Sequence, residues 1–344
     1  MNNRISWIDY AKGIGIILVV YGHVLIGLNT ANFNISESFF DNSIKLIYGF
    51  HMPLFFFLSG LFVERWANKN IGKGLSQKVQ SILWPYLFWS VIQGSVNVIL
   101  SSFTNSAMTW SQLGKNILIN PISQFWFLYV LFICFLLFAL LYRVTTVKII
   151  TLICAVLYVL SPFMEITLLR QLMFNFIFFA LGSLVVHIGK DMPKLVEATK
   201  GYVIYSFIGF LIFNSLYFTI SSNNFLNNIV QFFVAIAGIN LIIGVSVLLS
   251  KFNALKFIKH LGVTSMVIYL MHILSGSGVR IILTKLFHVY DASVHLIIGT
   301  LLGIIIPIVC YKIIIGIGIE RLILGEKGKK TFKNGNEIIL KKAK

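Results

Sequence analysis

Long apolar runs follow one another along this chain, and polar residues collect in the short segments between them. Each run is about 20 residues long, the length that an α-helix needs to cross the hydrocarbon core of a bilayer. The pattern predicts an all-α, polytopic integral membrane protein with about ten transmembrane helices. We place them at residues 8–28, 44–63, 82–103, 125–142, 147–163, 168–187, 202–220, 226–249, 262–284 and 294–317.

The composition excludes an ordinary soluble protein. Hydrophobic residues make up 58% of the 344 residues and charged residues only 11%, whereas a soluble domain usually has about 25% charged residues. The mean hydropathy is +0.88, so lipid must cover much of the surface. The net charge of +17 lies in short loops and in one tail. This distribution is typical of membrane topology, and we expect no nucleic-acid partner.

The distribution of Lys and Arg predicts the orientation. With the N-terminus inside, 22 of the 28 basic residues fall on the inner side and five on the outer side, as the positive-inside rule requires. Both termini are then cytoplasmic and the number of spans is even. Ser161 and Pro162 mark a break, so that residues 147–187 hold two spans or one span and a re-entrant segment. We expect a transmembrane domain at 1–320 and a basic cytoplasmic tail at 321–344 that anchors the topology.

The three cysteines, Cys134, Cys154 and Cys310, all lie within apolar runs. Their spacing predicts neither a disulfide framework nor a metal site. We also expect no cleaved signal peptide, because the first apolar run lacks a clear small-x-small cleavage site and many further spans follow it.

Three histidines stand out within the predicted spans: His23 in the first, His51 in the second and His272 in the ninth. Ionisable side chains in a membrane usually face the bundle interior or an aqueous cavity, because lipid solvates them poorly. A single such histidine is most often a hydrogen-bonded core residue. Three of them at middle to outer depth indicate a shared functional site, where a histidine can act as a general base.

The first span also carries a lysine, and its spacing from the histidine is informative. Lys12 and His23 are 11 residues apart, which brings them within about 20° of one helix face and separates them by roughly 16 Å along the axis. Asp9 and Lys12 can pair on this helix. Lys12 and Lys78 would offer cations to a phosphate-bearing ligand at the inner side. Ordinary positive-inside loading is the alternative, and it explains Lys12 less well because that residue lies a turn inside the apolar helix.

Two further polar features have simpler explanations. Ser59 could be a nucleophile, but small residues such as Ser59-Gly60 more often mark a close helix contact. The sequence Ser275-Gly276-Ser277-Gly278 lacks the context of a nucleophile elbow. We expect it to loosen the outer half of its span and to open backbone groups to a cavity. Arg280 follows it, either as an interface anchor or as a substrate contact.

Four stretches resemble the membrane acyltransferase-3 family, the bacterial O-acyltransferases of surface polysaccharides. They are IDYAKGIGIILVVYGH at 8–23, FHMPLFFFLSGLF at 50–62, SILWPYLFWS at 81–90 and GVTSMVIYLMHIL at 262–274. The resemblance covers nearly the whole chain and is greatest to the stand-alone fucose 4-O-acetylase-like branch, because no periplasmic esterase-like domain follows. In the family's first-span motif an arginine precedes an essential histidine by ten intervening residues. Here Lys12 stands at the arginine position. Lys78 and Ser81 stand at the positions of a paired-arginine motif before the third span, so that the chain departs from the family pattern at all three positions.

The resemblance implies an acetyl-CoA-dependent O-acetyltransferase in the bacterial cytoplasmic membrane, with no bound cofactor and no metal. His23 would be the catalytic base or, in a variant mechanism, carry the acyl group. Lys12 and Lys78 would bind acyl-CoA, while Asp9, His51, His272 and Arg280 would support the site or orient the substrate. The acceptor would be a lipid-linked or polymeric saccharide. A proton-coupled transporter or flippase with a histidine relay is the alternative function.

Overall fold

The structure is a computed structural model that describes residues 5–68, 71–101, 108–220 and 224–325. In these residues the secondary structure is helical throughout, with no strand. Arg4, Lys69 and most of the basic tail lie outside the described residues. The helices are α1 (Ser6–Thr30), α2 (Glu37–Tyr48), α3 (His51–Gly60), α4 (Val63–Ala67), α5 (Ile71–Lys78), η1 (Val79–Leu83), α6 (Trp84–Ile99), α7 (Trp110–Leu118), η2 (Ser123–Phe125), α8 (Trp126–Leu141), α9 (Val147–Leu160), η3 (Ser161–Phe163), α10 (Thr167–His187), α11 (Met192–Ala198), α12 (Tyr202–Thr219), α13 (Asn224–Lys251), α14 (Lys256–Val263), α15 (Ser265–Lys285), α16 (Ala292–Ile317) and α17 (Glu320–Leu324).

The all-α, polytopic membrane architecture is confirmed. Eight helical stretches among the described residues are long and apolar enough to cross a membrane, and Val147–Phe163 is a shorter apolar helix. Helix α9 ends at Leu160, a short 3-10 turn covers Ser161–Phe163, and α10 begins at Thr167. The break at Ser161-Pro162 therefore separates two distinct helices, which pack against each other.

The predicted span at 44–63 is not one helix. Helix α2 ends at Tyr48, and α3 begins at His51. Pro53 explains the break, because a proline lacks the backbone N–H and its ring clashes with the carbonyl four residues earlier. A proline is best tolerated in the first turn of a helix, and Pro53 is the third residue of α3. The break puts His51 at the start of α3.

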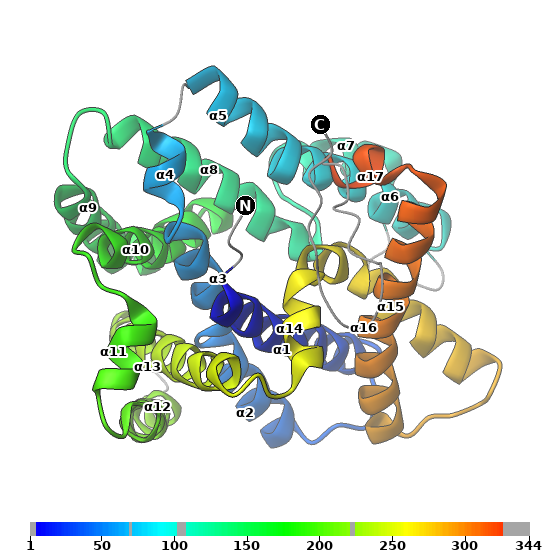
Figure 1. The fold of residues 1–344 in the computed structure, drawn as a ribbon. Helices are drawn as coiled ribbons and strands as arrows, with labels where there is room; N and C mark the ends of the chain where they lie inside the picture. Colours follow the sequence, from blue (N-terminus) through cyan, green and yellow to red (C-terminus); the bar gives the residue numbers. More distant parts are fainter. Residues whose placement is uncertain (1–4, 69–70, 102–107, 221–223, 326–344) are drawn as a thin grey trace.

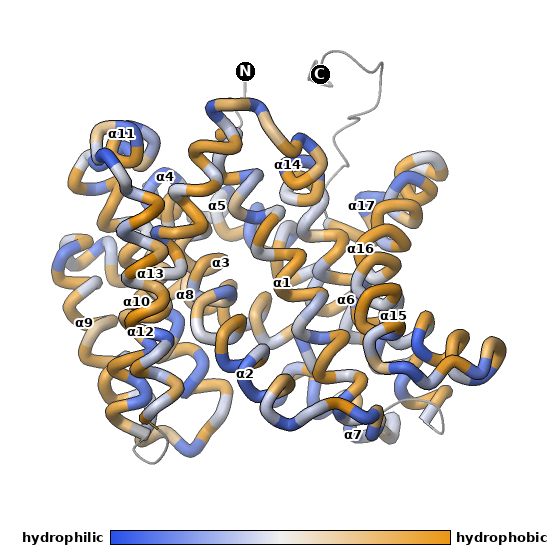
Figure 2. Tube along the Cα trace, turned by 90° about the horizontal axis from the view of Figure 1, so that it is seen from below, coloured by the Kyte–Doolittle hydropathy of each residue, from blue (hydrophilic) through white to orange (hydrophobic). Residues whose placement is uncertain are grey.

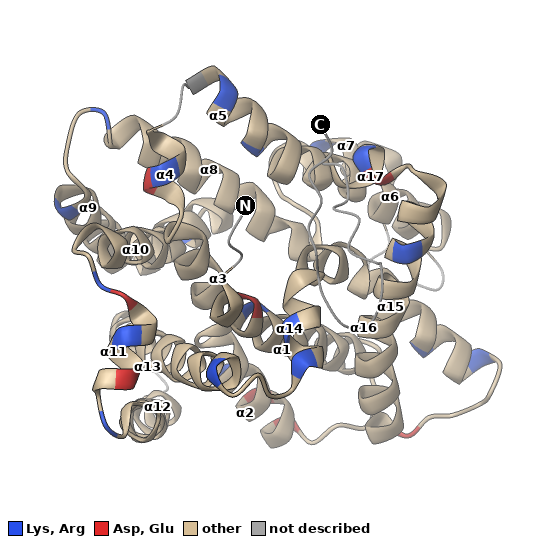
Figure 3. Cartoon of the chain, viewed as in Figure 1, with Lys and Arg blue, Asp and Glu red and all other residues tan. Residues whose placement is uncertain are grey.

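The two ends of the bundle differ in charge. Helices α5, α11 and α14 lie at one end of the molecule and α2 and α7 at the other (Figure 2). Figures 1 and 3 look onto the first end, where Lys and Arg gather on α4, α5, α11, α14 and α17. We call this end the basic face and the other the opposite face. The described chain begins and finishes near the basic face, in agreement with an even number of crossings.

Glycines set the closest helix contacts around α1 and α3. A Cβ on Gly13 would lie 2.0 Å from the Ile258 carbonyl oxygen of α14, and one on Gly262 would lie 1.7 Å from the Asp9 carbonyl oxygen. On α3, a Cβ on Gly60 would lie 2.0 Å from the Phe179 carbonyl oxygen of α10. A side chain at any of these positions would push two helices apart. The close-contact interpretation of Ser59-Gly60 is therefore confirmed at Gly60.

Candidate active site

A stripe of residues on α1 lines a cavity that begins near the basic face. Lys12, Ile16 and Val19 follow one another at helical spacing and all line this cavity of about 150 Å³, which we call the basic-face cavity. Its other lining residues come from α3, η1, α8 and α15: Met52, Phe55, Ser59, Ser81, Ile82, Phe127, Leu128, Leu131, Ser265, Met266 and Tyr269. The cavity is thus largely apolar, with one cation and a few hydroxyl groups.

The three predicted histidines lie next to residues at the deep end of the basic-face cavity. His23 follows the lining residue Val19 by one turn of α1. His51 directly precedes Met52, and His272 follows Tyr269 by one turn of α15. The tertiary structure therefore brings His23, His51 and His272 from three separate spans into one layer beyond the cavity. We call these three residues the histidine layer.

The histidine rings contact one another directly or through Tyr48. The ring centroids of His23 and His272 are 5.0 Å apart, with an edge-to-face angle of 67°. The Tyr48 ring lies 4.5 Å from His51 and 6.3 Å from His23. Tyr48 was not predicted from the sequence as a site residue. It is the last residue of α2, and only the break before α3 turns it toward the histidines.

Each of the three rings is oriented by a backbone carbonyl of its own chain segment. Nδ1 lies 2.9 Å from the Val19 oxygen in His23, 2.8 Å from the Ile47 oxygen in His51, and 2.7 Å from the Tyr269 oxygen in His272. A carbonyl oxygen only accepts hydrogen bonds, so Nδ1 carries the proton in each neutral ring. The lone pair is then on Nε2, the nitrogen that can take a proton from a substrate.

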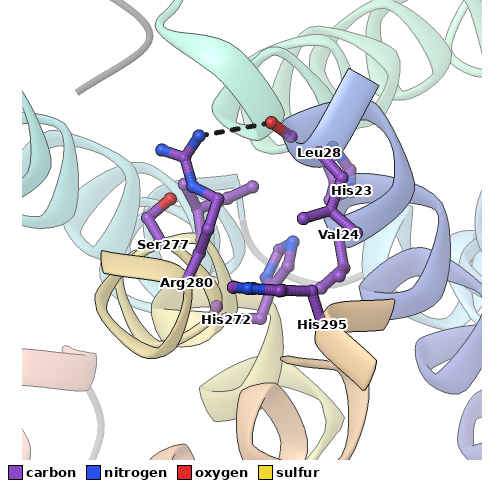
Figure 4. Close-up of a pocket in the computed structure, with 10 residues that line it drawn as sticks. His23, Val24, Leu28, His272, Ser277, Arg280 and His295 are labelled. Carbon is purple, nitrogen blue, oxygen red and sulfur yellow. Dashed lines mark hydrogen bonds between the residues drawn. The ribbon is translucent and has the colours of Figure 1, made fainter. Parts of the chain in front are cut away.

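A small cavity of about 30 Å³ lies between α1, α15 and α16 on the outer side of His23. His23, His272, Arg280 and His295 surround it (Figure 4). Arg280 Nη1 lies 3.4 Å from the Gly27 carbonyl oxygen, which ties the ends of α15 and α1 together. The space suffices for about one water molecule.

His295 is a histidine of this cavity that sequence reasoning missed. It begins the span of α16, and its Nε2 lies 2.9 Å from the Val289 carbonyl oxygen. Its ring packs 4.6 Å from that of Phe33. The only sequence signal was a histidine at the second residue of the predicted tenth span, 294–317.

The expected loosening of the outer half of the ninth span is wrong. Helix α15 runs unbroken from Ser265 to Lys285, and the Ser275 hydroxyl donates to the Met271 carbonyl oxygen at 3.1 Å. Gly276 lies where α15 passes α1, at a distance that would also allow a larger side chain. A Cβ there would lie 3.4 Å from Val24 of α1, and both residues line the small cavity.

The two predicted phosphate-binding lysines differ in position. Lys12 lines the basic-face cavity, whereas Lys78 is not among its lining residues. Lys78 Nζ lies over the ring of Phe135, 3.5 Å from its centroid. One turn later, Ser81 reaches the cavity from the π-helical turn η1. Pro85 is a physical reason for this wide turn, because its ring would clash with the Ser81 carbonyl in a regular helix.

Asp9 and Tyr269 are both buried near these groups. Asp9 is 3% exposed and lies one turn before Lys12; its pairing with Lys12 stays a prediction. The Tyr269 hydroxyl donates to the Gln124 carbonyl oxygen, and the Gln124 and Gln93 side chains exchange two hydrogen bonds, of 2.8 and 3.2 Å. This buried network fixes the Tyr269 side chain at the deep end of the basic-face cavity.

Comparisons with known proteins are consistent with the resemblance. A family model described as an acyltransferase domain matches residues 5–312. Nodulation protein NolL of Sinorhizobium fredii is 30% identical over 210 residues, which are 60% of this chain and 55% of the relative. Nodulation protein NolL of Mesorhizobium japonicum is 34% identical over 144 residues, 40% of this chain and 35% of the relative. The chain thus spans about a third to about half of these curated relatives. No solved structure matches it significantly.

Proposed function

This chain belongs to the acyltransferase-domain family that matches residues 5–312, and from that premise we propose that it is an acetyl-CoA-dependent O-acetyltransferase. It is a multi-pass membrane protein, which we assign to the bacterial cytoplasmic membrane with both termini in the cytoplasm. The acceptor is a hydroxyl group of a cell-surface polysaccharide or of its lipid-linked precursor. Membership of an acyltransferase family favours this function over a transporter or flippase.

The basic-face cavity is the proposed donor site. Acetyl-CoA is made in the cytosol, and the positive-inside rule places the basic face on that side. Lys12 supplies a cation for the phosphates, and Lys78 adds positive charge close to Ser81 at the cavity lining. The apolar walls formed by Ile16 and Val19 suit the narrow arm that carries the thioester. His23 is one turn beyond Val19, where that thioester would arrive.

His23 is the proposed general base. Its Nε2 takes the proton of the acceptor hydroxyl while the hydroxyl oxygen attacks the thioester carbonyl carbon. The new C–O bond forms, the C–S bond breaks, and the proton on His23 neutralises the departing CoA thiolate. In the variant mechanism Nε2 itself attacks the thioester carbonyl carbon, the C–S bond breaks and the CoA thiolate leaves. The acceptor hydroxyl oxygen then attacks the acetyl carbon and the N–C bond breaks, while the hydroxyl proton passes to the thiolate.

The other members of the histidine layer are proposed to orient the reactants. His272 contacts the ring of His23 directly, and His51 contacts it through Tyr48. The Nε2 atoms of His51 and His272 are buried and have no hydrogen-bond partner among the described residues. In the neutral rings these Nε2 atoms can therefore accept a hydrogen bond from a hydroxyl group of a bound substrate. Arg280 would hold the outer ends of α1 and α15 around it.

One observation carries the proposal: the α1 stripe that begins at Lys12 lines a cavity whose deep end adjoins three gathered histidines. The test is acetyl transfer from radiolabelled acetyl-CoA by the purified protein in lipid nanodiscs. A mixture of extracted cell-surface glycans serves as acceptor. We expect label in the glycan fraction that mild alkali releases as acetate. No label above a protein-free control would overturn the proposed function.

A further inference from the structure

A second cavity lies near the opposite face and is lined by side-chain amides. Its volume is about 420 Å³, within the usual range for ligand sites of about 300–1,000 Å³. We call it the amide-lined cavity. Its lining residues are Tyr48, Met52, Pro53, Trp126, Ser161, Pro162, Arg170, Gln171, Phe174, Asn175, Asn227, Asn228 and Gln231. They come from α2, α3, α8, η3, α10 and α13, and most lie near the end of a helix at the opposite face.

We infer that the amide-lined cavity is the saccharide-binding site of this protein, an inference that rests on the proposed function for the role of the bound sugar. Side-chain amides both donate and accept hydrogen bonds, as sugar hydroxyls do. The flat rings of Trp126, Tyr48 and Phe174 offer apolar faces for the C–H face of a sugar ring. Arg170 is exposed and is the one charged residue among the described lining residues. A cavity for an acyl chain would need few of these amides.

Asn175 places a buried polar side chain in the wall of the amide-lined cavity, although such burial costs free energy. It lies in the apolar helix α10, its side chain is 3% exposed, and its Nδ2 donates to the Gln171 carbonyl oxygen at 2.8 Å. Its Oδ1 has no hydrogen-bond partner among the described residues. A buried polar atom without a partner costs about 1–3 kcal/mol. Asn227 Oδ1 and the Tyr48 hydroxyl also belong to lining residues of this cavity. Both atoms are likewise buried without a hydrogen-bond partner among the described residues.

The walls of the cavity are held by hydrogen bonds between helices. Asn228 Nδ2 donates to the Tyr158 carbonyl oxygen at 3.0 Å, and the Tyr158 hydroxyl donates to the Asn228 carbonyl oxygen at 2.6 Å. This reciprocal pair fixes α13 against α9. The Ser161 hydroxyl donates to the Tyr158 carbonyl oxygen at 2.7 Å. The two lining residues Asn228 and Ser161 are therefore held in place by hydrogen bonds.

The amide-lined cavity adjoins the histidine layer from the side opposite to the donor cavity. Met52 lines both cavities, and His51 directly precedes it. Tyr48 lines the amide-lined cavity and its ring contacts those of His51 and His23. A sugar bound here would therefore approach the histidines from the opposite face, while the thioester approaches from the basic face.

The chain offers a matched control for Asn175. Asn214 on α12 is also buried, at 4% exposed, and its Nδ2 also donates to the carbonyl four residues earlier, at 2.7 Å. Its Oδ1 likewise lacks a partner among the described residues. Asn214, however, does not line the cavity. Asn175→Leu and Asn214→Leu therefore remove the same buried amide from two different places.

The test is direct binding to an array of immobilised neutral and acidic oligosaccharides by fluorescently labelled protein in nanodiscs. We expect the wild-type chain and Asn214→Leu to bind at least one saccharide equally. Asn175→Leu should bind it about tenfold more weakly, which is one lost hydrogen bond to a polar partner. Gln231→Leu, at a partly exposed position, should weaken it similarly and guards against a folding defect, which size-exclusion chromatography also monitors.

The outcomes separate this inference from the proposed function. If no saccharide binds, or if both cavity variants bind like the wild-type chain, the site assignment is wrong. Acetyl transfer to a glycan that survives in both cavity variants with unchanged KM for the acceptor would also overturn it, while leaving the proposed function intact. Saccharide binding that the cavity variants weaken, without any acetyl transfer, would support the site and overturn the proposed function.

Discussion

The two larger cavities flanking the histidine layer have opposite chemistry. The basic-face cavity is walled by Ile16, Val19 and aromatic side chains, with Lys12 as its cation. The amide-lined cavity presents asparagine and glutamine side chains around an aromatic wall. The basic-face cavity, apolar with one cation, suits a narrow acyl carrier that bears phosphates. The amide-lined cavity suits a polyhydroxylated ligand. On the proposed function, donor and acceptor would reach the same histidines from different faces.

Removing the base between the two cavities should have the largest effect. We expect His23→Ala to lower kcat for acetyl transfer by about 10²- to 10⁴-fold, because a sugar hydroxyl is a poor nucleophile until a base takes its proton. Binding of acetyl-CoA and of saccharide should persist, since neither cavity is lined by His23. Single-turnover transfer with labelled acetyl-CoA measures the loss.

The matched control for this variant is His187→Ala. His187 lies in a span but pairs with Glu64 at 3.2 Å, away from both cavities, and should keep wild-type turnover. His51→Ala and His272→Ala should be milder than His23→Ala. Near-normal turnover in His23→Ala would refute the mechanism, and a loss confined to His272→Ala would move the base to α15.

Substitutions of Lys12, the cation of the basic-face cavity, should change the KM for acetyl-CoA and not that for the acceptor. Lys12→Ala should raise KM for acetyl-CoA by about tenfold, the value of one charge-assisted contact to a phosphate, and leave acceptor affinity unchanged. Lys12→Arg should retain substantial activity, because the charge and reach survive. Steady-state kinetics with each substrate varied in turn separates the two constants.

Lys78→Ala should have a smaller effect on the same constant, because the Lys78 ammonium lies against the Phe135 ring rather than in the cavity lining. Lys73→Ala, another basic residue of α5, serves as the control for general surface charge. Unchanged kinetics in Lys12→Ala would make Lys12 a topology charge only.

The sidedness of the two cavities can be measured by thiol labelling. A membrane-impermeant maleimide should react with Asn227→Cys in intact cells from which any outer membrane has been removed. It should react with Ser81→Cys only in inverted vesicles, because Ser81 lines the basic-face cavity. Acetyl-CoA should slow labelling of Ser81→Cys and not of Asn227→Cys. A Cys310→Ser background removes the one partly exposed native thiol among the described residues.

The reverse labelling pattern would place the basic face outside and contradict the orientation. Reporter fusions at both termini and in the segment 65–78 give an independent check, with all three expected in the cytoplasm. A C-terminus found outside would mean an odd number of spans.

Much of the fold was predictable because a bilayer constrains each span locally. The apolar runs at 8–28 and 294–317 correspond to α1 and α16 almost residue for residue. The run at 44–63 was harder, since its hydrophobicity is continuous across a helix break. The sequence signal for the break was Pro53, which lacks a backbone N–H. Whether a proline breaks a helix also depends on how the neighbouring helices pack, and the sequence does not give that packing.

The amino-acid sequence by itself determined the membrane class, the charge asymmetry and the α1 stripe of Lys12 and His23, because length, charge and helical period are properties of contiguous residues. Only the tertiary structure decided which groups meet. It placed Tyr48, His272 and His295 around His23, and it gathered Asn175 and Asn227 from different helices into one cavity. The physical reason is that contacts between distant segments depend on how helices pack, and close packing at Gly13, Gly60 and Gly262 fixes that arrangement.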